Sequence, residues 1–220
     1  MNARIGACLA IMALSGCARA MAQDPAGTGG ELPPPGYGSL TRDYIAVQVT
    51  LGDVSMRFVP LDERLLRLTA PDAYQSLHGL VAARQGQIDS AAQAAGVNTP
   101  GVAMVTFFAL RQEAPFDPDN VTFSHRNQIY RPVAILPLTG NFTSRRLDVR
   151  QQASAIYLFD HPIPVFEPFA VLYETSVSEG WNEILRRVDR ERVRVQSRWQ
   201  SDRGKDSTTA AAKPDSATPN

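Results

Sequence analysis

Three histidines, His78, His125 and His161, are the side chains best suited to acid–base or metal chemistry in this chain. They are far apart in the sequence, and no HExxH-type helical pair, which would bind zinc, is present. Ser124 precedes His125 and could belong to a Ser–His–Asp triad assembled from scattered positions. No nucleophile elbow, Walker loop or Rossmann glycine pattern accompanies it. The sequence therefore predicts no catalytic residue, no cofactor and a protein that is not an enzyme.

One proline-rich segment, DHPIPVFEP over residues 160–168, brings together Asp160, His161 and Glu167. Carboxylates and imidazoles are metal ligands, so these three could bind a cation on one loop. The three prolines are more typical of a rigid connection between strands. We interpret the segment as structural and predict no metal there.

A second oxygen-rich segment is FDPDN, with Asp117, Asp119 and Asn120. Alternating oxygen donors suit calcium, but the glycine and the distal glutamate of an EF-hand loop are absent. An Asx-capped turn leading into a strand explains the same residues. The sequence leaves open whether Asp117 and Asp119 bind a cation.

Four arginines, Arg186, Arg190, Arg194 and Arg198, recur every fourth residue and form a cationic ribbon if the segment is helical. Such a ribbon could contact anionic headgroups or the acidic surface of a partner. Nearby carboxylates offer the alternative of a solvated, partly neutralised face; they are Glu183, Asp189 and Glu191. We take the ribbon as a candidate partner or membrane surface.

The first residues are typical of an export signal. Arg4 gives a positive start, and the following apolar run, IGACLAIMAL, is too short for a stable transmembrane anchor. Leu14-Ser15-Gly16-Cys17 directly after this run resembles the lipobox of bacterial lipoproteins. The resemblance implies cleavage before Cys17, a diacylglyceryl thioether on its sulfur and N-acylation of its amine. Several acyl chains give stable membrane anchoring.

Two further features bear on the leader. By the lipoprotein sorting rule, Ala18 after the modified cysteine implies the outer membrane, facing the periplasm or the cell surface. AMA at residues 20–22 also satisfies the small-x-small rule for ordinary cleavage, which would release a soluble periplasmic or secreted protein. Cys8 is lost with the leader, so the mature chain has no disulfide.

Length and composition predict one globular domain. The chain has 220 residues, and its 22 basic and 22 acidic residues give no net field that would attract nucleic acid. We predict a signal peptide over 1–16, a Gly/Pro-rich tether over 17–42, one domain over 43–200 and a disordered tail over 201–220.

Strand patterns dominate the predicted domain. Residues 44–59 alternate around Gly52-Asp53, which predicts a hairpin pairing Leu51 with Val54 and Val47 with Phe58. Later apolar runs, GVAMVTFFAL, NVTFSHR, YRPVAILPL, RLDVRQQ, SAIYLFD and FAVLYET, predict further strands. Prolines at 132 and 137 predict an edge or bulged strand. We expect a mainly β, α+β fold, an antiparallel sandwich of about eight strands, Ig-like or similar.

Two helices complete the predicted fold. One follows the hairpin, with Thr69 as N-cap, Pro71 in its first turn and Gly96 after its end. The other covers residues 178–199, capped by Ser178, although VRVQSRW also alternates as a strand would. The expected function is a lipid-anchored, non-catalytic envelope protein that binds or scaffolds another envelope component. A hydrolase with scattered catalytic residues is the alternative from another class.

Overall fold

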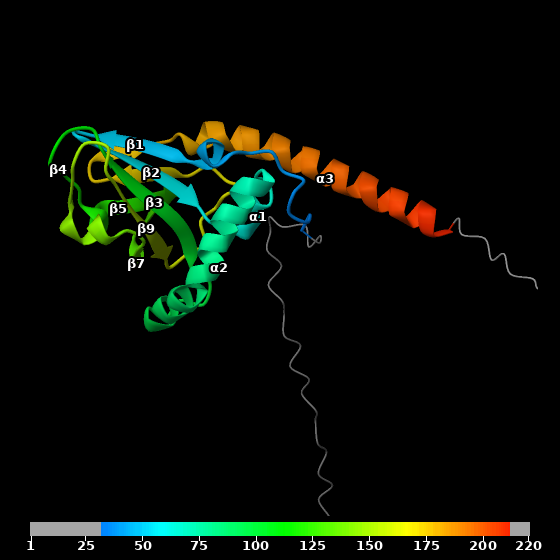
Figure 1. Ribbon diagram of the computed structural model, residues 1–220, viewed down its shortest axis with the longest axis horizontal. Coiled ribbons are helices and arrows are strands. Elements are labelled where there is room, and N and C mark those ends of the chain that lie inside the picture. The colour runs from blue at the N-terminus through cyan, green and yellow to red at the C-terminus, as the bar shows by residue number, and fades with distance from the viewer. Residues whose placement is uncertain (1–31, 212–220) are drawn as a thin grey trace, which may run out of the picture. The chain divides into compact units, whose positions relative to one another are not determined.

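The computed structural model describes residues 32–211, with side chains through residue 204. The leader, the lipobox and the first part of the tether lie outside these residues. Within them the chain forms eleven strands in three antiparallel sheets and helices after the first hairpin and at the C-terminal end (Figure 1). A mainly β, α+β fold is therefore confirmed. None of the helices described is long and apolar enough to cross a membrane.

The larger sheet has five strands in the order β1-β2-β3-β9-β7. Its strands are β1 (Val47–Leu51), β2 (Val54–Pro60), β3 (Gly101–Ala109), β9 (Gln152–Phe159) and β7 (Pro132–Pro137). The hairpin register is confirmed, since Leu51 pairs with Val54 and Val47 with Phe58. The edge prediction is also confirmed: β7 ends the sheet, and its register shifts between Pro132 and Ala134.

Two smaller sheets complete the β structure. The four-stranded sheet contains β11 (Ser176–Ser178), β10 (Ala170–Tyr173), β5 (Val121–His125) and β6 (Gln128–Tyr130), and the two-stranded sheet contains β4 (Ala114–Pro115) and β8 (Arg146–Leu147). The strand expected over RLDVRQQ is reduced to β8. Its neighbours Arg145 and Arg150 have φ of 53° and 70°, which interrupts extended backbone on both sides. Three short 3₁₀ turns are present among the described residues: η1 (Arg42–Ile45) precedes β1, and η2 (Pro118–Asn120) and η3 (Gly140–Ser144) connect strands.

Aromatic side chains from both larger sheets meet in one core. The ring of Phe159 in β9 lies 5.0 Å from Phe123 in β5 and 6.1 Å from Phe58 in β2. Phe169, just before β10, lies 6.4 Å from Phe58 and 4.7 Å from Trp181. Burial of such rings is the main stabilising term available to residues 32–211, which contain no cysteine.

Helix α2 (Pro71–Ala94) covers part of the larger sheet (Figure 1). Its Ile88 and Ala92 pack with Ile156 and Leu158 of β9. Pro71 is the first helical residue, as predicted, but the Thr69 cap prediction is wrong: the N-cap is Ala70. The Thr69 hydroxyl instead donates to the carbonyl of Leu66, 2.6 Å away, because the short helix α1 (Glu63–Leu66) ends just before it.

Helix α3 (Trp181–Ala211) begins beside β1 and runs past η1 (Figure 1). It is continuous through VRVQSRW, and it extends beyond residue 200, where the domain was expected to end. Its first residue is Trp181, and Ser178 belongs to β11, so Ser178 does not cap the helix. Its inward face contains Trp181, Val188 and Val195, which are fully buried.

Residues 32–40, which composition assigns to the tether, pack against the domain; we call them the N-terminal strap. Leu40 is 4% exposed, and its amide donates to the carbonyl of Leu68. A Cβ at Gly38 would lie 2.2 Å from the Leu68 carbonyl carbon, so only glycine allows this close approach. The Gly and Pro residues therefore belong to a backbone segment that packs closely against the domain. Composition alone cannot distinguish such a segment from a flexible linker.

Candidate functional site

Ser124 and His125 do not form a catalytic pair. The Nδ1 of His125 donates to the carbonyl of Pro168 at 3.0 Å, and its Nε2 lies 3.3 Å from Glu167. Arg126 binds the same carboxylate at 2.7 Å. With both ring nitrogens engaged, His125 has no free position from which to accept a proton from Ser124.

The proline-rich loop does not gather its three candidate ligands. Glu167 faces His125 and Arg126, as described above, while His161 is exposed and stacks loosely against Tyr130, with ring centroids 5.2 Å apart. Asp160 is 3.8 Å from His161. In the part of the chain that the structure describes, no cluster of three or more His, Cys, Asp or Glu side chains could hold a metal ion.

Asp117 and Asp119 lie in a capped turn bound by an arginine. Asp117 accepts from the amide of Asp119 at 3.1 Å and from the side chain of Asn120 at 2.7 Å. Arg145 lies 3.5 Å from Asp117 and 2.7 Å from Asp119. The guanidinium thus pairs with both carboxylates that the sequence offered to a cation and offsets one of their two charges.

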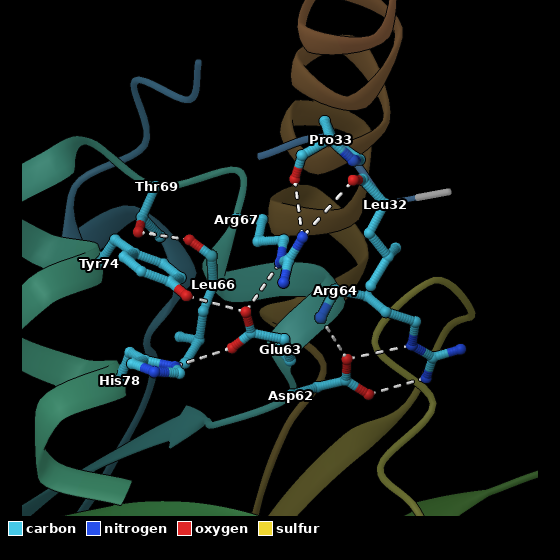
Figure 2. A network of polar contacts seen from close by, with 10 residues as sticks. All are labelled: Leu32, Pro33, Asp62, Glu63, Arg64, Leu66, Arg67, Thr69, Tyr74 and His78. Carbon is cyan, nitrogen blue, oxygen red and sulfur yellow. Dashed lines mark hydrogen bonds and ion pairs between the residues drawn. The ribbon is translucent and has the colours of Figure 1, made fainter. Parts of the chain in front are cut away.

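A polar cluster centred on Glu63 joins α1, α2 and the strap (Figure 2). The Glu63 carboxylate accepts from Arg67 at 2.7 Å, from the Tyr74 hydroxyl at 2.9 Å and from the Nδ1 of His78 at 3.1 Å. The imidazole of His78 stacks on Tyr74, with ring centroids 5.0 Å apart. Burial acts to raise the pKa of Glu63, but these donors outweigh burial and hold the pKa below its ordinary value.

The Glu63 cluster holds the start of the strap. Figure 2 shows Arg67 between the Glu63 carboxylate and the backbone of Leu32 and Pro33. One of its nitrogens donates to these two carbonyls at 3.5 and 3.1 Å. Arg67 therefore connects the α1 carboxylate to the point where the described chain begins.

A second carboxylate, Glu191 of α3, holds the end of the strap. It is 7% exposed and accepts from both the amide and the hydroxyl of Ser39, at 2.6 and 2.9 Å. Arg194 binds the same carboxylate and donates to the carbonyl of Tyr37 at 3.2 Å. Burial acts to raise the pKa of Glu191, but the donors from Arg194 and Ser39 hold it below its ordinary value.

The four predicted ribbon arginines do not share one surface. Successive members are four residues apart, and at 3.6 residues per turn each step rotates about 40° around the helix. Arg186 and Arg190 are exposed, with no ion pair among the residues described. Arg194 binds Tyr37 and Glu191, and Arg198 lies 5.9 Å over the Tyr37 ring. The ribbon therefore starts in solvent and ends on the strap.

Other arginines of α3 lie over aromatic rings along its flanks. Arg187 is 4.4 Å from the Tyr44 ring centre, and Arg192 is 4.8 Å from that of Phe166. Arg203 lies 5.1 Å over Trp199. Guanidinium stacking of this kind stabilises the pair. Arg192 also pairs with Asp189 at 3.2 Å, which offsets its charge.

Charge is divided unevenly between α3 and the rest of the described chain. Residues 181–204 carry seven arginines and four carboxylates, a net charge of +3, whereas residues 32–180 carry eleven arginines and fourteen carboxylates, a net charge of −3. The total for the whole chain hides this difference. Counting charge element by element would have found it from the sequence.

A surface hollow of about 480 Å³ lies between η1 and the start of α2. It is lined by Thr41, Arg42, Asp43, Arg57, Asp72, Ala73 and Ser76. The ion pair between Arg57 and Asp43, at 2.7 Å, occupies its wall, and none of the three histidines lines it.

Comparisons of the chain with protein-family models, with curated proteins and with solved structures gave no significant match.

Proposed function

We propose that the chain is a lipid-anchored, non-catalytic protein of the bacterial envelope, attached through Cys17 to the outer membrane, where it binds or scaffolds another envelope component. The lipobox is the observation behind the proposed location. The strap fits a domain that is attached to a membrane through its N-terminal end. Residues 32–40 are fixed at both ends, by Arg67 through Leu32 and Pro33 and by Glu191 through Ser39. A fixed strap sets the point on the domain at which the tether is attached.

The state of the candidate chemical groups supports a non-catalytic role. His125, Glu63 and Asp117 are each engaged by several neighbours, among them Pro168, Tyr74 and Arg145 from other segments of the fold. A general base needs a free lone pair within reach of a substrate proton. These three groups instead connect loops and helices of the described chain.

We retain as a proposal that the two larger sheets form an Ig-like sandwich. Support comes from the common aromatic core, in which Phe58 and Phe159 of one sheet approach Phe123 and Phe169 at the other. An experimentally determined structure would test it through the angle between the sheets, which is close to 30° in aligned sandwiches.

Replacement of Cys17 tests the anchor. Cys17→Ser should abolish labelling by a fatty-acid analogue and move the protein from the membrane to the soluble fraction. Cys8→Ser is the matched control, because Cys8 lies in the part of the leader that either cleavage would remove. An unchanged membrane fraction for Cys17→Ser, or a mature N-terminus at Gln23, would contradict the proposal and support cleavage after Ala22.

A further inference from the structure

Helix α3 presents exposed positive charge that no carboxylate of the described chain neutralises. Arg186 and Arg190 are one turn apart on its solvent side, and Val193, 64% exposed, follows them. Of the flanking arginines, Arg187 lies over the Tyr44 ring and keeps its charge near the surface, whereas Arg192 lies over Phe166 and pairs with Asp189 at 3.2 Å. We propose that this side of α3 docks on the anionic phospholipid headgroups of the membrane that holds the tether, a proposal that rests on the lipid anchor for its geometry.

The tether brings α3 close to that membrane. With acylation at Cys17, fifteen residues separate the lipid from Leu32. Fifteen residues, fully extended, span at most about 50 Å. Tyr37 and Ser39 of the strap bind α3 five and seven residues after Leu32, where the tether joins the strap beside Arg67. At such an effective concentration, weak headgroup contacts are enough for docking.

The charge division selects the orientation. A leaflet with negative surface potential attracts the +3 of α3 and repels the −3 of residues 32–180. The exposed aromatic ring of Tyr44, beside Arg187, has the amphipathic character that favours the headgroup region. Lipid phosphate therefore fits this surface through charge, aromatic flanks and distance from the anchor.

Vesicle binding by the unacylated mature chain tests the docking surface separately from the anchor. The Cys17→Ser chain should sediment with vesicles of phosphatidylglycerol and phosphatidylethanolamine, and not with vesicles of phosphatidylcholine. Each arginine near an anionic surface contributes about a 5-fold gain in binding, so Arg186→Gln with Arg190→Gln should weaken sedimentation about 25-fold. Arg131→Gln with Arg146→Gln removes the same charge from exposed positions outside α3 and should leave binding unchanged.

Three outcomes would overturn the proposal: no binding to phosphatidylglycerol vesicles, equal losses in both double variants, or loss of an acidic protein partner from the α3 variant with vesicle binding intact. Each of these leaves the anchor itself standing, because acyl labelling at Cys17 measures the anchor separately. Equal urea midpoints for the two double variants would establish that both are folded.

Discussion

Glu63 and Glu191 each accept hydrogen bonds from more than one segment of the chain. Glu63 binds groups from α1 and α2, and Glu191 joins α3 to Ser39. Such carboxylates are costly to bury and gain from being fully hydrogen-bonded, so losing one partner leaves the others unsatisfied. At the residue scale the strap depends on these two side chains.

Glu191→Gln should destabilise the folded chain by about 2 kcal/mol, because an amide offers only one oxygen to Ser39 and turns its own donors toward Arg194. Urea unfolding followed by circular dichroism would measure the change. Glu183→Gln, at an exposed position of the same helix, is the control and should change stability by less than about 0.5 kcal/mol. Equal effects of the two substitutions would refute this role for Glu191.

Acid should weaken the fold through the same two groups. In the folded chain the pKa of Glu63 and of Glu191 lies below the ordinary value of 4.5, so the unfolded chain binds more protons as the pH drops. Their stabilisation is complete above about pH 4.5 and is lost as the pH falls through the lowered folded pKa. Urea midpoints across acid pH should fall less steeply in Glu63→Gln and Glu191→Gln than in the parent. Parallel curves would contradict the assignment.

At the scale of elements, two glycines lower the intrinsic helical stability of α2. Gly79 and Gly86 are exposed helical positions, and a Cβ at either would meet no atom within 4 Å. Replacing glycine by alanine inside a helix typically gains about 1 kcal/mol. Gly79→Ala and Gly86→Ala should therefore each raise the melting temperature of the protein, as measured by calorimetry.

Gly38→Ala is the opposite case among the glycines. Its Cβ would lie 2.2 Å from the Leu68 carbonyl, so the strap must move away from α1. Overpacking of this kind costs about 1–3 kcal/mol. Hydrogen exchange at the amides of Ser39 and Leu40 should accelerate in Gly38→Ala and stay slow in Gly140→Ala, whose added methyl meets open space. Unchanged protection in Gly38→Ala would exclude a tightly fitted strap.

At the scale of the whole molecule, the sequence predicts what depends on local pattern. The hairpin register, the buried run of β3 and the edge position of β7 follow from side-chain alternation and from proline, which acts within its own strand. The Thr69 cap, the end of α3 and the strap depend on partners far along the chain. Ser39 meets Glu191 across 152 positions, and no local pattern encodes that contact.

The arginines of the candidate site show the same difference between what a local pattern predicts and what depends on distant partners. Helical spacing predicts the ribbon of arginines on α3, but it does not distinguish Arg186 and Arg190 in solvent from Arg194 and Arg198 on Tyr37. That distinction comes from the strap, which composition assigns to the tether. The residues that bind the strap can therefore be identified only once the position of the strap is known.

The boundary of the folded unit gives the most direct test at this scale. The composition of the sequence predicts that the domain starts at residue 43. In the structure, however, Leu40 is already buried and Ser39 binds Glu191. A chain of residues 43–211 loses the burial of a leucine, about 2 kcal/mol, and the donors of a buried carboxylate, about another 2 kcal/mol. Its free energy of unfolding should therefore be about 4 kcal/mol below that of residues 32–211, as measured by urea unfolding. Equal stability of the two chains would show that residues 32–42 belong to the tether after all.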